Sequence, residues 1–236
     1  MRMLLFVGLV VGICSPCFAQ SGFKEIFNGK DLTGWKGNPK LWSVEDGAIT
    51  GKTSAEDPIK KNTFIVWQDG KVADFELELE YRLRAGDESK PGGNSGIQYR
   101  SKLVDEAEFI VGGYQADIDF DLRYSGINYE ERGRGILAER GQRVTLVADE
   151  QGKLKKNVES IGDAGELGKK INKGEWNKYR VVAKGNRLSH YINDTLMSET
   201  IDNMSSAAAK DGILAFQIHV GPPMIIQFRN VRLKAE

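Results

Sequence analysis

The chain has 236 residues, of which 40% are hydrophobic, and its 33 basic side chains balance its 33 acidic ones. This balance gives no charged surface for nucleic acid or for an anionic membrane, so we expect neither as a partner. Both cysteines, Cys14 and Cys17, lie in the first twenty residues, and the chain has two histidines, His190 and His219. The rest of the chain therefore excludes disulfides, thiolate metal sites and multi-histidine zinc sites.

The first nineteen residues have the pattern of an export signal. Arg2 gives a positive start, residues 4–13 are apolar, and residues 17–19 (CFA) form a small-x-small cleavage site. The apolar run is shorter than the ~20 residues that span a bilayer, so we expect no integral membrane span. We therefore predict that residues 1–19 are a signal peptide.

The mature protein is predicted to begin at Gln20 and to form a single domain, residues 20–236, in the periplasm or outside the cell. Removal of the signal leaves 32 basic and 33 acidic side chains. The alternative, a lipoprotein acylated at Cys14 or Cys17, is less favoured because neither cysteine follows the usual Leu-small-small sequence.

Short runs in which apolar and polar residues alternate fill most of the mature chain. A period of two is typical of strands with one buried face. The predicted strands are residues 42–45 and 48–50, joined by an Asp46-Gly47 turn; 75–83; 179–183 and 188–192, joined by a turn at Gly185-Asn186; and 225–233. No long amphipathic helix competes with them, so the sequence predicts an all-β fold, a two-sheet antiparallel β-sandwich.

Two stretches interrupt this pattern. Residues 123–141 are rich in glycine and charge, and we expect a long loop or a small hairpin near the rim of a sheet. Residues 149–175 are polar and contain six lysines, and we expect at most a short helical turn there because glycine weakens a longer helix.

Polar residues that recognise hydroxyl groups occupy one side of three further strands. In residues 96–100, 114–120 and 214–220, apolar residues alternate with Gln, Asp, His or Arg rather than with the Lys, Glu, Thr and Ser of an ordinary solvated face. These residues are Gln98, Arg100, Gln115, Asp117, Asp119, Gln217 and His219. We predict that the strands place them on one sugar-sized binding surface.

Among the titratable residues, His219 is the best candidate for a base, because histidine titrates near neutral pH and this one shares a face with Gln217. His190 lies between apolar residues and is predicted to be a hydrogen-bonded core or edge residue. Two series of carboxylates recur at every second residue, Glu76/Glu78/Glu80 and Asp117/Asp119/Asp121. We interpret the first as a solvated face. In the second we interpret Asp117 and Asp119 as functional, because they sit beside Gln115 and just after Gly112-Gly113, where a bulge or a close backbone approach is expected.

Five segments carry a resemblance to a known family. They are residues 27–35 (FNGKDLTGW), 42–47 (WSVEDG), 93–100 (GNSGIQYR), 175–177 (EWN) and 228–234 (FRNVRLK). Their order and spacing, from about Phe23 to Lys234, resemble the bacterial 3-keto-disaccharide hydrolases, also described as 3-keto-glucoside lyase/hydratases. The resemblance implies a concanavalin A-like jelly-roll fold, in agreement with the sandwich predicted above.

The resemblance also implies a substrate, a glycoside oxidised to a ketone at C3. The ketone acidifies the C2 hydrogen, so a base can remove it and expel the C1 substituent, and the unsaturated sugar is then hydrated. His219 or Asp117 would be the base, and Arg100 or Arg229 would stabilise the enolate. The residues that recognise the substrate would be Gln98, Gln115, Gln217 and Asp119. The first step needs no strongly activated water or covalent nucleophile, and the resemblance implies no definite cofactor. A divalent metal ion held by Asp117 and Asp119 could share the enolate role.

Two alternatives use the same residues. A non-catalytic carbohydrate-binding module would need the polar and aromatic residues but no base. A retaining glucanase would need a nucleophile and an acid on alternate positions of one strand, as Asp117, Asp119 and Asp121 are spaced, although the mixed Glu-x-Asp-x-Glu pattern is absent. Relatives often carry a glutamate in this strand where the present chain has Gln115, which cannot act as an acid or base.

Overall fold

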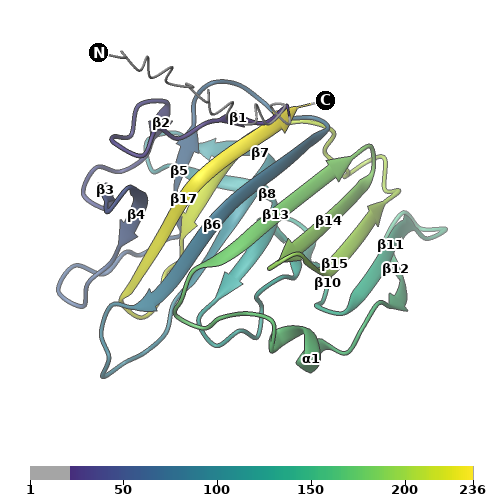
Figure 1. Ribbon diagram of the computed structural model, residues 1–236. Helices are drawn as coiled ribbons and strands as arrows, with labels where there is room; N and C mark the ends of the chain where they lie inside the picture. Colours follow the sequence, from purple (N-terminus) through teal and green to yellow (C-terminus); the bar gives the residue numbers. More distant parts are fainter. Residues whose placement is uncertain (1–21, 236) are drawn as a thin grey trace, which may run out of the picture.

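The structure, a computed structural model, describes residues 22–235. Two large β-sheets pack face to face, and the one helix among these residues, α1 (Ala164–Gly168), lies outside the sheets (Figure 1). No helix in the described part of the chain has the length and apolar character needed to cross a bilayer. The predicted signal peptide, with Cys14 and Cys17, and the predicted start at Gln20 lie outside the described residues.

The first sheet has ten strands. Nine follow the order β12-β11-β15-β14-β13-β6-β17-β4-β3, and β1 pairs with β17. Every neighbouring pair is antiparallel except β11 and β15. The strands are β1 (Lys24–Glu25), β3 (Trp42–Glu45), β4 (Ala48–Lys52), β6 (Phe75–Ala85), β11 (Gln142–Ala148), β12 (Leu154–Ser160), β13 (Asn177–Lys184), β14 (Arg187–Ile192), β15 (Thr195–Asp202) and β17 (Met224–Ala235).

The second sheet has seven strands, all antiparallel to their neighbours, in the order β10-β9-β8-β7-β16-β5-β2. They are β2 (Trp35–Lys36), β5 (Thr63–Trp67), β7 (Asn94–Asp105), β8 (Ile110–Asp119), β9 (Asn128–Glu131), β10 (Gly135–Ala138) and β16 (Ile213–Ile218). The two sheets confirm the predicted all-β sandwich.

The main core lies between the sheets and is built from the alternate residues of their strands. Leu77 and Leu79 of β6 are buried there, as are Ile97 of β7 and Phe216 of β16. The Phe216 ring stacks on Phe228 of β17 with a centroid distance of 4.1 Å, which joins the two sheets directly. Successive side chains of a strand point to opposite faces, so the residues between these apolar positions face outward.

The predicted hairpins are present. Asp46 and Gly47 both have positive φ (51° and 73°), as the two-residue turn between β3 and β4 requires. The glycine-rich residues 123–141 contain the hairpin of β9 and β10. Residues 149–175 contain the expected short helix, but also β12, which the sequence did not predict because most of its side chains are polar and exposed.

The hairpin of β7 and β8 curls over the outer face of the second sheet. Its pairing is interrupted by two bulges, and beyond them the carbonyl of Phe109 accepts a hydrogen bond of 3.0 Å from the Phe64 amide of β5. Val111 of β8 thereby covers Phe64, Val66 and Ala215 in an apolar cluster separate from the main core. The curled hairpin therefore leaves only part of this outer face open.

Candidate functional site

The register of three neighbouring strands collects polar side chains on the outer face of the second sheet. Between β7 and β8, Asn94 is paired with Asp119, Gly96 with Asp117, and Gln98 with Gln115. These residues alternate with the inward-facing Ile97, Ala116 and Ile118 of the main core. β16 continues the same face with Gln217, followed by His219, whose amide donates to the Asn94 carbonyl at 3.3 Å.

This face is hollowed into a pocket of about 380 Å³, which we call the hollow. Its lining combines residues from the sheet with residues from the loop after β8 and from the segment before β5. They are Asn62, Asn94, Gln115, Asp117, Asp119, Tyr124, Ile127, Tyr129, Glu131, Ile136 and His219. The lining residues therefore include four of the predicted site residues, and they include no lysine or arginine.

Two predicted glutamines lie at or beneath the floor of the hollow. Gln98 is fully buried and donates from Nε2 to Gln115 Oε1 at 2.7 Å, while its own Oε1 accepts from Ser101 Oγ at 2.7 Å. Gln115 lies over Gly96, where an added Cβ would come within 2.5 Å of its side chain. The bond from Gln98 thus fixes the Gln115 amide, which in turn hydrogen-bonds Asp117.

Gln217 is also buried next to the hollow, on β16. Its Nε2 donates to Glu131 Oε2 at 3.4 Å, whereas its Oε1 has no hydrogen-bond partner among the described residues. A buried acceptor without a partner costs free energy unless a ligand or water satisfies it. Gln98 therefore supports Gln115 in the floor of the hollow, and Gln217 supports Glu131. Of the three glutamines predicted to recognise the substrate, Gln115 lines the hollow.

Asp117 is the most strongly perturbed carboxyl group of the hollow. Its side chain is 6% exposed, and its Oδ1 accepts hydrogen bonds from Asn94 Nδ2 at 3.1 Å and from the Ile118 amide at 3.0 Å. Burial raises the pKa of Asp117 well above its ordinary range, and the nearby charge of Asp119 adds to this effect against the opposing hydrogen bonds. A carboxyl group with a raised pKa in a pocket is suited to proton transfer near neutral pH.

Asp119 lines the hollow but is engaged by the following turn. Its Oδ2 accepts from the amides of Arg123 at 2.9 Å and Tyr124 at 3.4 Å. Asp121 lies beyond the end of β8, is exposed, and pairs with Lys173 at 3.1 Å. Of the three aspartates in the series, Asp117 and Asp119 therefore line the hollow, and Asp121 does not.

His219 is half-buried at the edge of the hollow, directly after β16. Its Nδ1 lies 2.6 Å from the Val220 carbonyl, so this nitrogen is the donor and Nε2 remains available. The Val220 amide donates to Asn62 Oδ1 at 2.9 Å, which places Asn62 beside His219. The other histidine, His190, is fully buried in the core between the Tyr99 hydroxyl and the Ile127 carbonyl, as predicted.

Glu131 and Tyr129 of β9 were not predicted as site residues. Glu131 accepts at 3.4 Å from Asn62 Nδ2 through Oε1 and is held by Gln217 through Oε2. Burial, followed by the charges of Glu131 and Asp117, raises the pKa of Tyr129, so this phenol lies near both carboxyl groups. The signal available in the sequence was the alternation in residues 128–131 (NYEE), within a stretch where we expected a loop or small hairpin.

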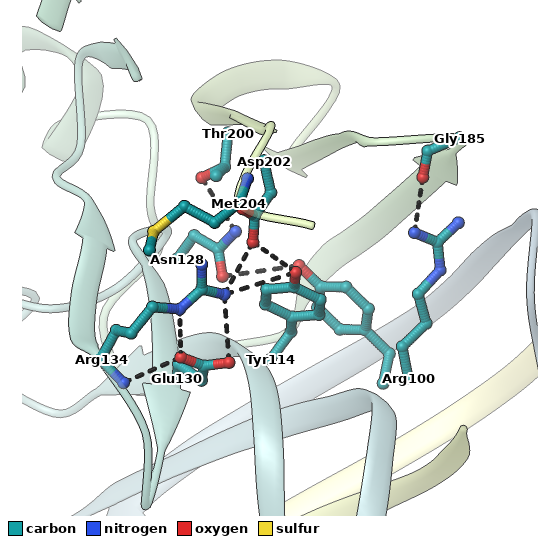
Figure 2. A network of polar contacts seen from close by, with 10 residues as sticks. Arg100, Tyr114, Asn128, Glu130, Arg134, Gly185, Thr200, Asp202 and Met204 are labelled. Atoms are coloured by element: carbon teal, nitrogen blue, oxygen red, sulfur yellow. Dashed lines mark hydrogen bonds and ion pairs between the residues drawn. The ribbon is translucent and has the colours of Figure 1, made fainter. Parts of the chain in front are cut away.

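Arg100 does not face the hollow, which corrects the predicted surface. It lies in the first bulge of β7 with φ of 45°, so its side chain leaves the alternation of the strand. Its guanidinium donates to the carbonyls of Ala73 and Gly185 at 2.7 Å and to Asp74 Oδ1 at 2.8 Å. Figure 2 shows it pointing toward Gly185, at the turn between β13 and β14 of the first sheet.

The same view shows a buried polar network that joins the sheets. The Tyr114 hydroxyl of β8 donates to Asp202 Oδ2 of β15 at 2.5 Å, and Arg134 Nη2 donates to the same oxygen at 2.7 Å (Figure 2). Arg134 also pairs with Glu130 at 2.6 Å. Arg100 and this network have a structural role, since each holds elements of one sheet against the other.

Arg229 is likewise far from the hollow, because β17 belongs to the first sheet. It pairs with Glu80 at 2.6 Å on the outer face of that sheet, and its guanidinium lies 3.9 Å from the centre of the Trp176 ring. Glu76 and Glu78 pair in the same way with Arg180 and Arg232. The glutamate series is therefore an ion-paired outer face, and neither predicted arginine can stabilise an enolate in the hollow.

A divalent metal ion at Asp117 and Asp119 has an incomplete ligand set in this arrangement. No group of three or more His, Cys, Asp or Glu side chains suited to a metal ion occurs within residues 22–235. Asp117 Oδ1 and Asp119 Oδ2 already accept hydrogen bonds from the protein. The two carboxylates thus do not by themselves fit the six to eight oxygen ligands of Ca²⁺ or the octahedral set of Mg²⁺.

Comparison with known proteins identifies relatives. The profile of the 3-keto-alpha-glucoside-1,2-lyase-like domain matches residues 22–234 of the chain. A 3-keto-disaccharide hydrolase of Bacteroides thetaiotaomicron is 34% identical over 92 residues, which are 35% of this chain and 29% of that protein. The match thus spans less than a third of the length of this curated relative.

Solved structures resemble the fold. Two proteins of Parabacteroides distasonis, each proposed to be a glycosyl hydrolase, superpose on this chain with TM-scores of 0.57 and 0.56. Their sequence identities to it are 19% and 22%. Each match covers 91% of this chain, and the matches cover 99% and 94% of the two other chains. The carbohydrate-binding module CBM66 of Bacillus subtilis superposes with a TM-score of 0.52 at 16% identity, over 86% of this chain and 97% of the module. At these identities the likeness concerns the fold alone.

Proposed function

We propose that this chain, which belongs to the 3-keto-alpha-glucoside-1,2-lyase-like family, cleaves the glycosidic bond of 3-keto-glycosides by elimination followed by hydration. The observation that carries the proposal is the buried carboxyl group of Asp117 in a hollow lined by hydroxyl-recognising side chains. A volume of about 380 Å³ lies within the range of small-molecule sites, and the amides and phenols around Asp117 suit the hydroxyl groups of one sugar ring.

In the first step, Asp117 acts as the base that removes the proton from C2 of the sugar. The electron pair of the C2–H bond forms the C1=C2 double bond, the C1–O bond breaks, and the leaving oxygen takes up a proton. Burial raises the pKa of Asp117, which makes its carboxylate a stronger base than an exposed one. Water then adds across the double bond, with oxygen at C1 and a proton at C2.

His219, at the edge of the hollow, would supply the proton to the leaving oxygen from Nε2 of its imidazolium form, because Nδ1–H is engaged by the Val220 carbonyl. Neutral donors, rather than the arginines that we first expected, would stabilise the enolate oxygen at C3. The candidates are the amides of Asn62, Asn94 and Gln115 and the phenol of Tyr129. No step requires a metal ion, and a divalent ion at Asp117 and Asp119 remains only a prediction.

Two variants test the roles. Asp117→Asn should lower kcat on a 3-keto-glucoside by about 10²-fold or more, and His219→Ala should also lower it. Because the folded-state pKa of Asp117 is raised, its contribution to stability is present at low pH and is lost as the pH rises through that pKa. Asp117→Asn should therefore be as stable as the parent at pH 4 and more stable at pH 8, which separates lost chemistry from misfolding.

Substrate deuterated at C2 tests the mechanism. Elimination breaks the C2–D bond, so the deuterium should be lost to solvent, while the corresponding unoxidised glucoside should remain intact. Retention of deuterium with normal turnover would reject elimination. Measurable sugar binding without turnover of either substrate would instead support a carbohydrate-binding module.

A further inference from the structure

The strand β12 lies at one edge of the first sheet, and its outer side is open (Figure 1). It pairs with β11 on one side, and no strand of the described chain pairs with it on the other. The other edge strands, β3, β10 and β2, have four, four and two residues, whereas β12 has seven. Short edge strands limit pairing with other chains, so β12 is the edge best able to bind another strand.

β12 has the regular form that strand pairing requires. Its register with β11 continues through all seven residues without a bulge, and its sequence (LKKNVES) contains neither glycine nor proline. Residues 155–160 are exposed, and Val158 has 54% of its surface accessible, which leaves an apolar side chain within an otherwise polar edge. Lysines normally protect such an edge, so their placement decides whether it can pair.

The hydrogen bonds between β11 and β12 show which backbone groups of β12 point outward. The Asp149 amide donates to the Lys153 carbonyl at 2.8 Å, and the Ile161 amide donates to the Gly141 carbonyl at 2.9 Å. Both bonds continue the register of the two strands. Hydrogen-bonded pairs of an antiparallel ladder recur at every second residue. The odd-numbered residues of β12 therefore bond to β11, and the amides and carbonyls of residues 154, 156, 158 and 160 point outward.

The outward groups of two copies fit together when the strands pair antiparallel about a twofold axis at Asn157. Residue 154 then lies opposite residue 160 of the second copy, and residue 156 lies opposite residue 158. Each outward-pointing amide and carbonyl thus meets outward-pointing groups, as a hydrogen-bonded pair requires. A shift of the second strand by one residue would instead place outward groups opposite inward ones.

Charge selects this register among those that the backbone allows. With the axis at Asn157, Lys155 lies opposite Glu159 of the second copy on both sides of the axis. These are non-hydrogen-bonded pairs, where cross-strand side chains approach most closely and opposite charges are favourable. A shift by two residues in one direction opposes the two Lys156 side chains and moves the partner of Glu159 into the turn. A shift by two in the other direction pairs Glu159 with the uncharged Asn157.

Lys156 leaves the edge accessible for this pairing. Its Nζ donates to the Ile136 carbonyl of β10 in the second sheet, so its charge is directed into its own molecule. In the register at Asn157, its aliphatic stem lies opposite Val158 of the second copy. The stem would therefore cover that exposed apolar side chain.

We propose that the protein forms a twofold dimer through β12, in which the first sheets of two copies join into one continuous sheet. Glu159 is 68% exposed, so it is accessible to Lys155 of the second copy although Arg143 Nη1 lies 3.5 Å away. The hollow lies on the outer face of the second sheet, outside this interface. The inference therefore does not depend on the proposed function.

Charge reversal tests the register, with association measured by sedimentation velocity over a range of concentrations. The unmodified protein should dimerise reversibly. Lys155→Glu and Glu159→Lys should each raise the dimer dissociation constant by about tenfold or more, because both cross-strand pairs become like-charged. An equimolar mixture of the two variants should associate as well as the unmodified protein, because each Glu then meets a Lys. Lys40→Glu, at an exposed lysine before β3, should leave dimerisation unchanged.

A disulfide tests the position of the axis. No cysteine follows residue 17, so Asn157→Cys introduces a single thiol into the rest of the chain. At the axis the two Cα atoms would be about 4.5 Å apart, within disulfide range, so mild oxidation should give a covalent dimer. Val158→Cys should form one far more slowly, because its two copies would be diagonal neighbours about 7–8 Å apart.

Three results would overturn the proposal. The first is a monomer at every concentration, and the second is a dimer that both charge reversals leave unchanged. The third is a mixture of the two charge variants that fails to associate although each variant is folded. Misfolding of the variants is distinguished by their circular dichroism and by recovery of the dimer on mixing.

Discussion

His190 is a buried base that should make the stability of the fold depend on pH. It lies between the Tyr99 hydroxyl at 2.9 Å and the Ile127 carbonyl at 3.1 Å, and burial lowers its pKa to about 4. A lowered folded-state pKa means that the unfolded chain binds the proton first as the pH falls below the ordinary histidine value. The stability is therefore complete above about pH 6.5 and is lost progressively toward pH 4.

We expect the free energy of unfolding to fall by on the order of 3 kcal/mol between pH 7 and pH 4 through this residue. Urea unfolding of the unmodified protein and of His190→Gln at both pH values measures it. The variant should be less stable at pH 7 but should lose less stability on acidification. Equal losses in the two proteins would show that His190 is not the responsible group. Because Ile127 also lines the hollow, the bond from His190 fixes one wall of the site.

At the scale of the strands, the close approach of β7 and β8 at Gly96 determines how the floor of the hollow is built. Gln115 occupies the space that a Cβ at Gly96 would need, and it is pinned there by Gln98. Gly96→Ala should displace the Gln115 amide, raise KM, and destabilise the protein by about 1–3 kcal/mol, as overpacking usually does.

A double-mutant cycle supplies the control for this prediction. In a Gln115→Ala background the space above residue 96 is free, so Gly96→Ala should cost much less stability than in the unmodified protein. Additive costs, measured by thermal unfolding of the four proteins, would show that the contact between these two strands is not the cause.

At the scale of the whole molecule, we predict that residues 1–19 direct export of the protein. We expect protein expressed with its full sequence in a bacterial host to be recovered from the periplasm or the medium, to begin at Gln20 and to contain no thiol, since both cysteines precede that residue. Intact-mass measurement and thiol titration check this. A lipid-modified mass that begins at Cys14 or Cys17 would contradict it.

The sequence by itself determined the sandwich, several of its hairpins and much of the polar lining of the hollow. Alternation with a period of two is a local property, so it shows which residues of β7, β8 and β16 share a face without any knowledge of their neighbours. Asp117, Gln115 and His219 were found in this way. The Asp46-Gly47 turn could also be predicted from the sequence, because the positive φ values of a two-residue turn depend only on the residue types at those two positions.

Only the tertiary structure decided which faces meet, because contacts between distant segments depend on strand order and on bulges. Arg100 leaves its expected face through a bulge, and Arg229 belongs to the other sheet, which alternation cannot reveal. Glu131 and Asn62 reach the hollow because β9 pairs with β8 and the chain before β5 borders the same face. The burial that raises the pKa of Asp117 is likewise a sum over these long-range contacts, so no short stretch of sequence contains it.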